Sequence, residues 1–198
     1  MMDKSISIKE RIMVLLSGRG SNFINLAKYL KTNSHHKIIA VASDNPAAQG
    51  LSYAKEIALP ILLLDYQAGR GFAEKTLADY IIKENIYYIL LAGFMKILSK
   101  DFVMKFPHRI LNIHPSLLPL YKGLDTHKRV IANGDKEHGC SVHLVDETLD
   151  GGALLAQRWI KVLPNDTEES LAEKVLAMEH ELYPFVLQHI EILIEPIL

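Results

Sequence analysis

The residues Leu111 to Pro119, LNIHPSLLP, bring together an amide and an imidazole. In an extended segment the side chains of Asn112 and His114 point to the same face, and those of Leu111 and Ile113 point to the other. An amide N–H and a protonated imidazole can stabilise a developing oxyanion, and an imidazole can also supply a proton. The alternative is a pair of polar residues that are simply hydrogen-bonded at the end of a strand.

A second candidate is the acidic turn DETLDGG at 146–152. Its carboxylates do not have the spacing of an EF-hand, so a solvated hairpin turn is the ordinary interpretation. The functional interpretation is that one carboxylate pairs with His114 and favours the charged imidazolium. Spacing alone cannot bring Asp150 to His114, so this pairing depends on the fold.

The glycine-containing turn SGRGSN at 17–22 is a candidate anion site. Glycines let the backbone approach a ligand closely, and the free N–H groups of a first helical turn favour an anion. Ser21 and Asn22 add side-chain donors, which predicts a phosphate site. The alternative is a tight strand-to-helix turn with Ser21 or Asn22 as N-cap. The motif is neither a Walker loop nor a complete GxGxxG fingerprint, since Phe23 stands where the third glycine should be.

The nine histidines and the single cysteine do not indicate a metal or a thiol nucleophile. The sequence has no HExxH motif. His138 and His143 lack both the additional cysteines of a zinc centre and the i, i+4 spacing of two ligands on one helix, so we expect no metal. His143 is expected to cover one face of a strand. Cys140 lies in an apolar segment without an adjacent cation, which favours a small buried hydrophobe.

Short apolar runs alternate with helix-like segments through the first half of the chain. Expected strands at 12–16, 38–43, 61–64 and 86–92 alternate with helices over 21–31, 47–58 and 71–84. Continuous apolar runs of this length fit strands buried on both faces, and the alternation predicts βαβ units. The predicted fold class is therefore α/β, with a doubly wound, mostly parallel sheet.

The second half of the chain has a different character. We expect a short helix over 99–106 with Ser99 as N-cap, a strand at 110–114, and then a long irregular loop. Strands at 140–145 and 153–162 precede a final helix over about 167–190. For that helix, Asp166 with Glu169 is the better capping box, in preference to Thr167 with Ser170. No repeat or linker interrupts the sequence, which predicts one domain over 1–198 with halves of about 11–100 and 101–198.

Charge and composition exclude several classes of protein. Lys plus Arg is 22 and Asp plus Glu is 23, which gives a net charge of −1 and argues against a nucleic-acid binder. A single cysteine excludes an intramolecular disulfide and favours a reduced, cytoplasmic setting. Residues 1–10 lack the apolar block of a signal peptide, and the longest apolar run, 86–95, is too short to span a membrane.

Taken together, five motifs resemble the phosphoribosylglycinamide formyltransferase family, the folate-dependent enzymes of purine synthesis. They are SGRGSN at 17–22, LAGFMKIL at 91–98, LNIHPSLLP at 111–119, HGCSVH at 138–143 and LDGG at 149–152, in the family's order over residues 12–184. The resemblance implies the formyltransferase fold with a Rossmann-like N-terminal half. It also implies metal-free transfer of the formyl group of 10-formyltetrahydrofolate, a consumed cosubstrate, to the primary amine of phosphoribosylglycinamide.

The resemblance further implies roles for particular residues. Asn112, His114 and Asp150 are expected to be catalytic. The ribose phosphate is expected on Gly20, Ser21 and Asn22, with Glu179 at the sugar or glycinamide end. The expected folate-binding residues are Arg70 at the folate tail, Met95, Lys96, Ile97, Leu98, Asn112, Val145, Asp146 and Asp150. Three positions depart from the family pattern: Lys96, where arginine is common; Asp125, where histidine is frequent; and Leu176, where a polar residue is frequent.

Other functions remain open at the level of sequence. A formyltetrahydrofolate deformylase shares the same catalytic residues but transfers the formyl group to water. A non-catalytic nucleotide-binding domain would use the glycine turn without needing Asn112, His114 and Asp150. A methionyl-tRNA formyltransferase is disfavoured, because 198 residues with a net charge of −1 offer neither its additional RNA-binding domain nor a basic surface. We expect a monomer or homodimer with small-molecule substrates and with neither nucleic acid nor membrane as partner.

Overall fold

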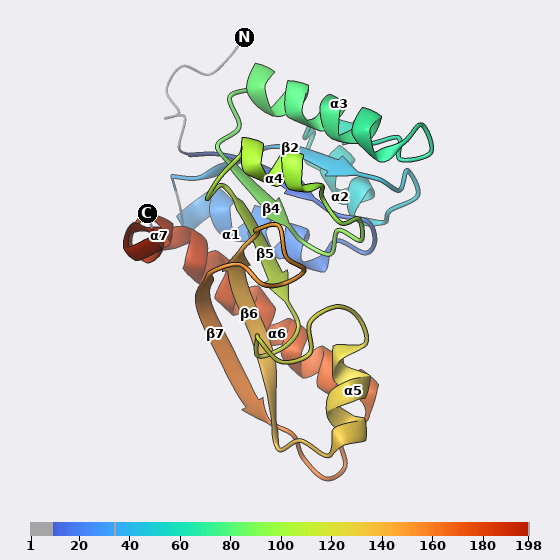
Figure 1. Cartoon of the computed structure of the whole chain (residues 1–198), viewed down its shortest axis with the longest axis vertical. Helices are drawn as coiled ribbons and strands as arrows, with labels where there is room; N and C mark the ends of the chain where they lie inside the picture. Colours follow the sequence, from blue (N-terminus) through green and yellow to red (C-terminus); the bar gives the residue numbers. More distant parts are fainter. Residues whose placement is uncertain (1–9, 34, 198) are drawn as a thin grey trace. The chain divides into compact units, whose positions relative to one another are not determined.

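The computed structural model describes residues 10–33 and 35–197 (Figure 1). The chain divides after Leu111 into two compact units. Among the helices within the described ranges, none combines the length and the apolar character that a membrane crossing requires.

The first unit is built on parallel strands. They are β1 (Arg11–Leu15), β2 (Lys37–Ser43), β3 (Ile61–Leu63) and β4 (Tyr88–Leu91), followed by the start of β5 (Ile110–His114). The order in the sheet is β3-β2-β1-β4-β5, and β1 pairs in parallel with both β2 and β4. All five residues of β1 are buried. The apolar run after residue 10 is therefore a central strand, as its sequence predicts.

Four helices accompany these strands: α1 (Ser21–Asn33), α2 (Gly50–Glu56), α3 (Arg70–Lys83) and α4 (Lys100–Lys105). Figure 1 shows α3 on one side of the strands of this unit and α1 on the other, which is the doubly wound arrangement. Ser99 is the N-cap of α4, as predicted, because its Oγ accepts from the N–H of Phe102 at 3.2 Å.

The second unit continues from β5 to β6 (Glu137–Leu144) and β7 (Leu154–Lys161), which pair antiparallel around the predicted acidic turn. Its helices are α5 (Thr126–Asn133), α6 (Glu168–Gln188) and α7 (Ile190–Ile194), with a 3-10 turn at Glu195–Ile197. Helix α6 packs on β6, β7 and α5. A mostly parallel sheet with an antiparallel last strand confirms the predicted fold class.

Two sequence-based predictions in this unit are wrong. Helix α5 lies where an irregular loop was expected. It begins after Asp125, which has a left-handed backbone conformation and makes no side-chain cap. Within this helix, only Thr126 and Val130 are buried. The capping box of α6 is formed by Thr167 and Ser170 and not by Asp166. The Asp166 carboxylate instead accepts from the Leu163 N–H at 2.8 Å, the Ser170 hydroxyl at 2.8 Å and the Lys174 ammonium at 2.5 Å.

Candidate active site

The amide of Asn112 on β5 contacts the ring of His143 on β6. The Asn112 Nδ2 lies 3.1 Å from Nε2 of His143, and His143 Nδ1 lies 2.8 Å from the carbonyl oxygen of Leu144. A carbonyl can only accept, so Nδ1 carries the proton, and in the neutral ring Nε2 accepts from Asn112. Burial lowers the pKa of His143, which favours this neutral form.

His114 ends β5 with its ring buried between two acceptors. Its Nδ1 lies 3.5 Å from Oδ2 of Asp150, and its Nε2 lies 2.9 Å from the carbonyl oxygen of Tyr121. A neutral imidazole has one N–H and satisfies only one of these acceptors, whereas the imidazolium has two and satisfies both. The surroundings of His114 therefore suit a positively charged ring.

Asp150 is held in place by backbone conformation and by a main-chain donor. It has a left-handed φ of 46° in the turn between β6 and β7, and its Oδ2 accepts from the N–H of Gly123 at 2.8 Å. Its Oδ1 lies 3.7 Å from Nε2 of His143. The fold thus brings Asn112, His114 and Asp150 into one cluster, with His143 as a fourth member.

The sequence analysis assigned no chemical role to His143, the fourth member of this cluster. A histidine alternating with apolar residues along a strand is typical of a side chain that covers a sheet face, and its pairing with Asn112 depends on strand order. The signal in the sequence is the HGCSVH motif, in which His143 lies on the same strand face as Ser141.

The loop that supplies Tyr121 and Gly123 to this cluster is anchored on β6 and β7. The Ser141 hydroxyl donates to the carbonyl of Ser116 at 2.6 Å and accepts from the N–H of Leu118 at 3.0 Å. The side-chain amide of Gln157 donates to the carbonyl of Leu118 at 2.9 Å. These bonds hold the loop after His114 to the two strands that flank the acidic turn.

The glycine turn in the first unit forms the predicted strand–turn–helix junction. Gly20 has a φ of +72°, and a Cβ on it would lie 2.7 Å from the Cα of Gly50. Ser21 is the first residue of α1, a helix of 13 residues, and Asn22 is buried in its first turn. The close approach of two backbones explains why glycine is needed, and the helix start provides N–H groups suited to an anion.

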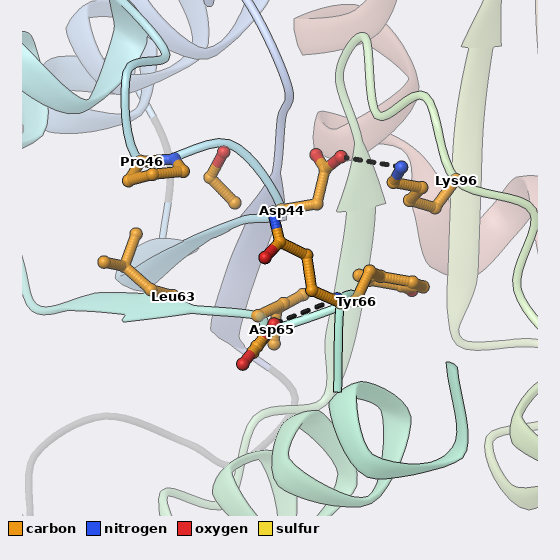
Figure 2. A pocket seen from close by; sticks show the side chains of 9 residues that line it. Asp44, Pro46, Leu63, Asp65, Tyr66 and Lys96 are labelled. Atoms are coloured by element: carbon orange, nitrogen blue, oxygen red, sulfur yellow. Dashed lines mark hydrogen bonds and ion pairs between the residues drawn. The ribbon is translucent and has the colours of Figure 1, made fainter. Parts of the chain in front are cut away.

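The segment 95–98 follows β4 and exposes apolar side chains. Met95 is 63% and Ile97 65% exposed, whereas Leu98 is buried. Lys96 Nζ lies 3.6 Å from Oδ2 of Asp44 and 5.6 Å from the centre of the Tyr66 ring. Figure 2 shows the Lys96 and Asp44 side chains directed toward one another. Exposed apolar side chains of this kind suit a flat, largely apolar ligand.

A cavity of about 470 Å³ lies in the first unit, where β2 and β3 end (Figure 2). It is lined by Ser43, Asp44, Pro46, Leu63, Leu64, Asp65, Tyr66, Gln67 and Lys96. Among the residues expected to bind folate, Lys96 lines this cavity. Burial, together with the charges of Glu74 and Asp44, raises the pKa of Tyr66, so the phenol stays protonated near neutral pH. The cavity lacks an acid–base pair comparable to His114 and Asp150.

The remaining expected site residues lie on separate elements. Arg70 is the exposed first residue of α3, and Glu179 is buried in α6 of the second unit. Val145 and Asp146 follow β6, where Asp146 Oδ1 accepts from the N–H of Thr148 at 2.8 Å. Across residues 10–33 and 35–197, no group of three or more His, Cys, Asp or Glu side chains is placed to hold a metal ion.

The doubly wound, mostly parallel sheet, the glycine turn after β1 and the cluster of Asn112, His114 and Asp150 are those of an α/β protein with a candidate acid–base site. The chain belongs to the formyl transferase family, whose model matches residues 10–187.

Individual relatives agree with this assignment. The chain is 41% identical over 179 residues to the phosphoribosylglycinamide formyltransferase of Escherichia coli, covering 89% of this chain and 84% of that protein. It is 39% identical over 194 residues to the trifunctional purine biosynthetic protein adenosine-3 of Chironomus tentans, covering 94% of this chain. The chain spans 14% of the length of that larger relative.

The fold agrees with a solved structure as well. The phosphoribosylglycinamide formyltransferase of Coxiella burnetii, determined in complex with CHES, matches with a TM-score of 0.86 and 40% identity, covering 90% of this chain and 85% of that one. The likeness in fold therefore extends over 90% of this chain, at 40% sequence identity.

Proposed function

We propose that this chain transfers the formyl group of 10-formyltetrahydrofolate to the primary amine of phosphoribosylglycinamide in de novo purine biosynthesis. The observation that carries the proposal is the cluster in which Asp150 lies 3.5 Å from His114 and Asn112 lies on the same strand as His114. It occurs in a member of the formyl transferase family that is similar along most of its length to enzymes named for this reaction.

The chemistry follows from the charges in the cluster. Attack of the amine on the formyl carbon forms a C–N bond and places negative charge on the formyl oxygen. The Asn112 amide donates an N–H to that oxygen, and the positive charge of the His114 imidazolium stabilises it electrostatically. Collapse breaks the bond to the folate nitrogen, which gains a proton while the amine loses one. Asp150 supplies the counter-charge to the imidazolium and assists this proton movement through water.

The two substrates are assigned to the residues that suit them chemically. The ribose phosphate is proposed to lie on Gly20, Ser21 and Asn22, since the start of α1 offers N–H groups to an anion. Glu179 is proposed to contact the sugar or the glycinamide. The folate is proposed to lie against the segment 95–98, with Arg70 at its tail. Val145, Asp146 and Asp150 are also proposed as folate-binding residues.

The proposal implies two small-molecule substrates and no metal. It places the chain as a monomer or homodimer in the cytoplasm, with neither nucleic acid nor membrane as partner.

The test is turnover of 10-formyltetrahydrofolate by the purified protein with and without phosphoribosylglycinamide. We expect tetrahydrofolate to form only when the amine is present, in a 1:1 ratio with formylated product. Release of formate independent of the amine would instead identify a deformylase. The absence of turnover with both substrates would identify a binding domain without catalytic activity.

A further inference from the structure

We propose that the hydroxyl of Ser17 is a positioning residue for the cosubstrate: it fixes the backbone of the segment 95–98, against which the folate is proposed to bind. This inference rests on the proposed function and assigns a role to a residue outside the expected site.

Ser17 follows β1 at the start of the glycine turn and contacts the ends of two neighbouring strands. Its Oγ accepts from the N–H of Met95 at 2.8 Å and donates to the carboxylate of Asp44. Its N–H donates to the carbonyl of Gly93 at 3.0 Å, and its carbonyl accepts from the side-chain amide of Asn45, also at 3.0 Å. One residue therefore joins the segments that follow β1, β2 and β4.

The direction of these bonds is dictated by chemistry. A serine hydroxyl has one proton, and a carboxylate can only accept, so the proton goes to Asp44. The lone pairs of Oγ then remain for the N–H of Met95. The other carboxylate oxygen of Asp44 lies 3.6 Å from the ammonium of Lys96. Ser17 and Asp44 thus hold the backbone of Met95 and the side chain of the next residue together.

This polar anchoring matters because residues 95–97 have little apolar packing of their own, whereas Leu98 at the end of the segment is buried. Met95 and Ile97 are mostly exposed, and the Lys96 side chain is 43% exposed, whereas that of Asp44 is only 9% exposed. An exposed side chain contributes little burial free energy to fix the backbone beneath it. The partly buried pair of Ser17 and Asp44 is therefore the contact that sets where the exposed apolar side chains lie.

Ser99 offers a matched comparison in the same unit. Its N–H donates to Glu74 at 2.7 Å, its hydroxyl donates to the same carboxylate, and its Oγ caps α4. Like Ser17, it is a serine that donates to a poorly exposed carboxylate. Ser99 directly follows the segment 95–98 in the chain, but its hydroxyl contacts Glu74 on α3 and the N–H of Phe102 on α4 and makes no bond to residues 95–98.

The experiment compares steady-state kinetics and thermal unfolding of Ser17→Ala, Ser17→Thr and Ser99→Ala. We expect Ser17→Ala to raise KM for 10-formyltetrahydrofolate about tenfold with kcat changed less than threefold, and Ser17→Thr, which keeps the hydroxyl, to recover most of the loss. A tenfold change corresponds to about 1.4 kcal/mol, the scale of one hydrogen bond. We expect Ser99→Ala to lower Tm and leave this KM unchanged.

A second variant, Asp44→Asn, keeps an acceptor for Ser17 and removes the charge that faces Lys96. We expect a smaller rise in the same KM, about threefold. An unchanged KM in folded Ser17→Ala would overturn the inference, and so would an equal rise in Ser99→Ala. Wild-type protein without formyl transfer would instead refute the proposed function, so the two failures are distinguishable.

Discussion

The amide of Asn112 is oriented by His143, whose own proton is committed elsewhere. His143 Nδ1 donates to the carbonyl of Leu144 at 2.8 Å, which leaves Nε2 to accept from Asn112 Nδ2 at 3.1 Å. With that nitrogen fixed toward β6, the second N–H of the Asn112 amide has a defined direction. A single hydrogen bond to a buried neutral histidine thus orients a proposed oxyanion donor.

The first prediction concerns this bond. Replacing His143 by leucine removes the acceptor, and we expect kcat for formyl transfer to fall about tenfold, because one hydrogen bond is worth about 1 kcal/mol. His143→Gln, whose side-chain oxygen can accept, should lose less activity. Steady-state kinetics of both variants at pH 7.5 measures the difference. Equal activity of wild type and His143→Leu would show that Asn112 is oriented by other contacts.

The second prediction concerns the charge of Asp150. In Asp150→Asn the side chain that faces Nδ1 of His114 is neutral, so positive charge on the ring during the reaction loses its counter-charge. We expect kcat to fall about 10²-fold. Asp79→Asn, at an exposed carboxylate paired with Lys75 on α3, is the control. An Asp150→Asn variant with the wild-type kcat would contradict the pairing.

The third prediction concerns the two glycines of the turn. A Cβ on Gly20 would lie 2.7 Å from the Cα of Gly50 at a φ of +72°, whereas a Cβ on Gly18 meets nothing within 4 Å. Gly20→Ala should therefore lower Tm and raise KM for phosphoribosylglycinamide at least tenfold, since the start of α1 must shift. Gly18→Ala should do neither. Similar KM values for the two variants would remove the argument for a close backbone approach at this site.

The fourth prediction concerns stability in acid. His138 is buried against His127, with Nε2 and Nδ1 3.0 Å apart, and burial lowers the pKa of His138 to about 4. The unfolded chain binds this proton near pH 6.5 and the native state does not, so stability falls as pH decreases from about 6.5 to 4. His138→Gln should reduce the slope of the free energy of unfolding in that window by up to about 1.4 kcal/mol per pH unit.

Chemical denaturation at several pH values between 4 and 8 measures this slope. Burial also lowers the pKa values of the half-buried His127 and the buried His143, so a residual slope is expected in the variant. An identical slope in wild type and His138→Gln would contradict the assignment.

The parallel strands and glycine turn of the first unit could be predicted because each depends on local residues. The apolar run that became β1 is continuous and ends at a glycine turn, which leaves few alternatives to a buried strand. Helix α5 could not be predicted in the same way. It has eight residues, no side-chain cap and only two buried positions, so its local signal is weak.

The cluster of Asn112, His114, His143 and Asp150 was only partly predictable. Asn112 and His114 share a strand face, which follows from a spacing of two residues. Two other contacts could not be predicted: that of Asp150 with His114 and that of His143 with Asn112. They depend on the pairing of β5 with β6 and on the left-handed backbone at Asp150, and the spacing of the residues along the sequence reveals neither. The capping box of α6 failed as a prediction because competing partners occupy Asp166.

The most direct test compares the rate of formyl transfer by His114→Ala with that by His35→Ala. The second variant is the control, because His35 is an exposed histidine of the first unit. With both substrates saturating and both variants folded by circular dichroism, we expect kcat of His114→Ala to fall at least about 10²-fold, as for loss of a positioned acid or base. His35→Ala should match wild type. A His114→Ala variant that retains the wild-type rate would contradict the central claim that this imidazole carries the reaction.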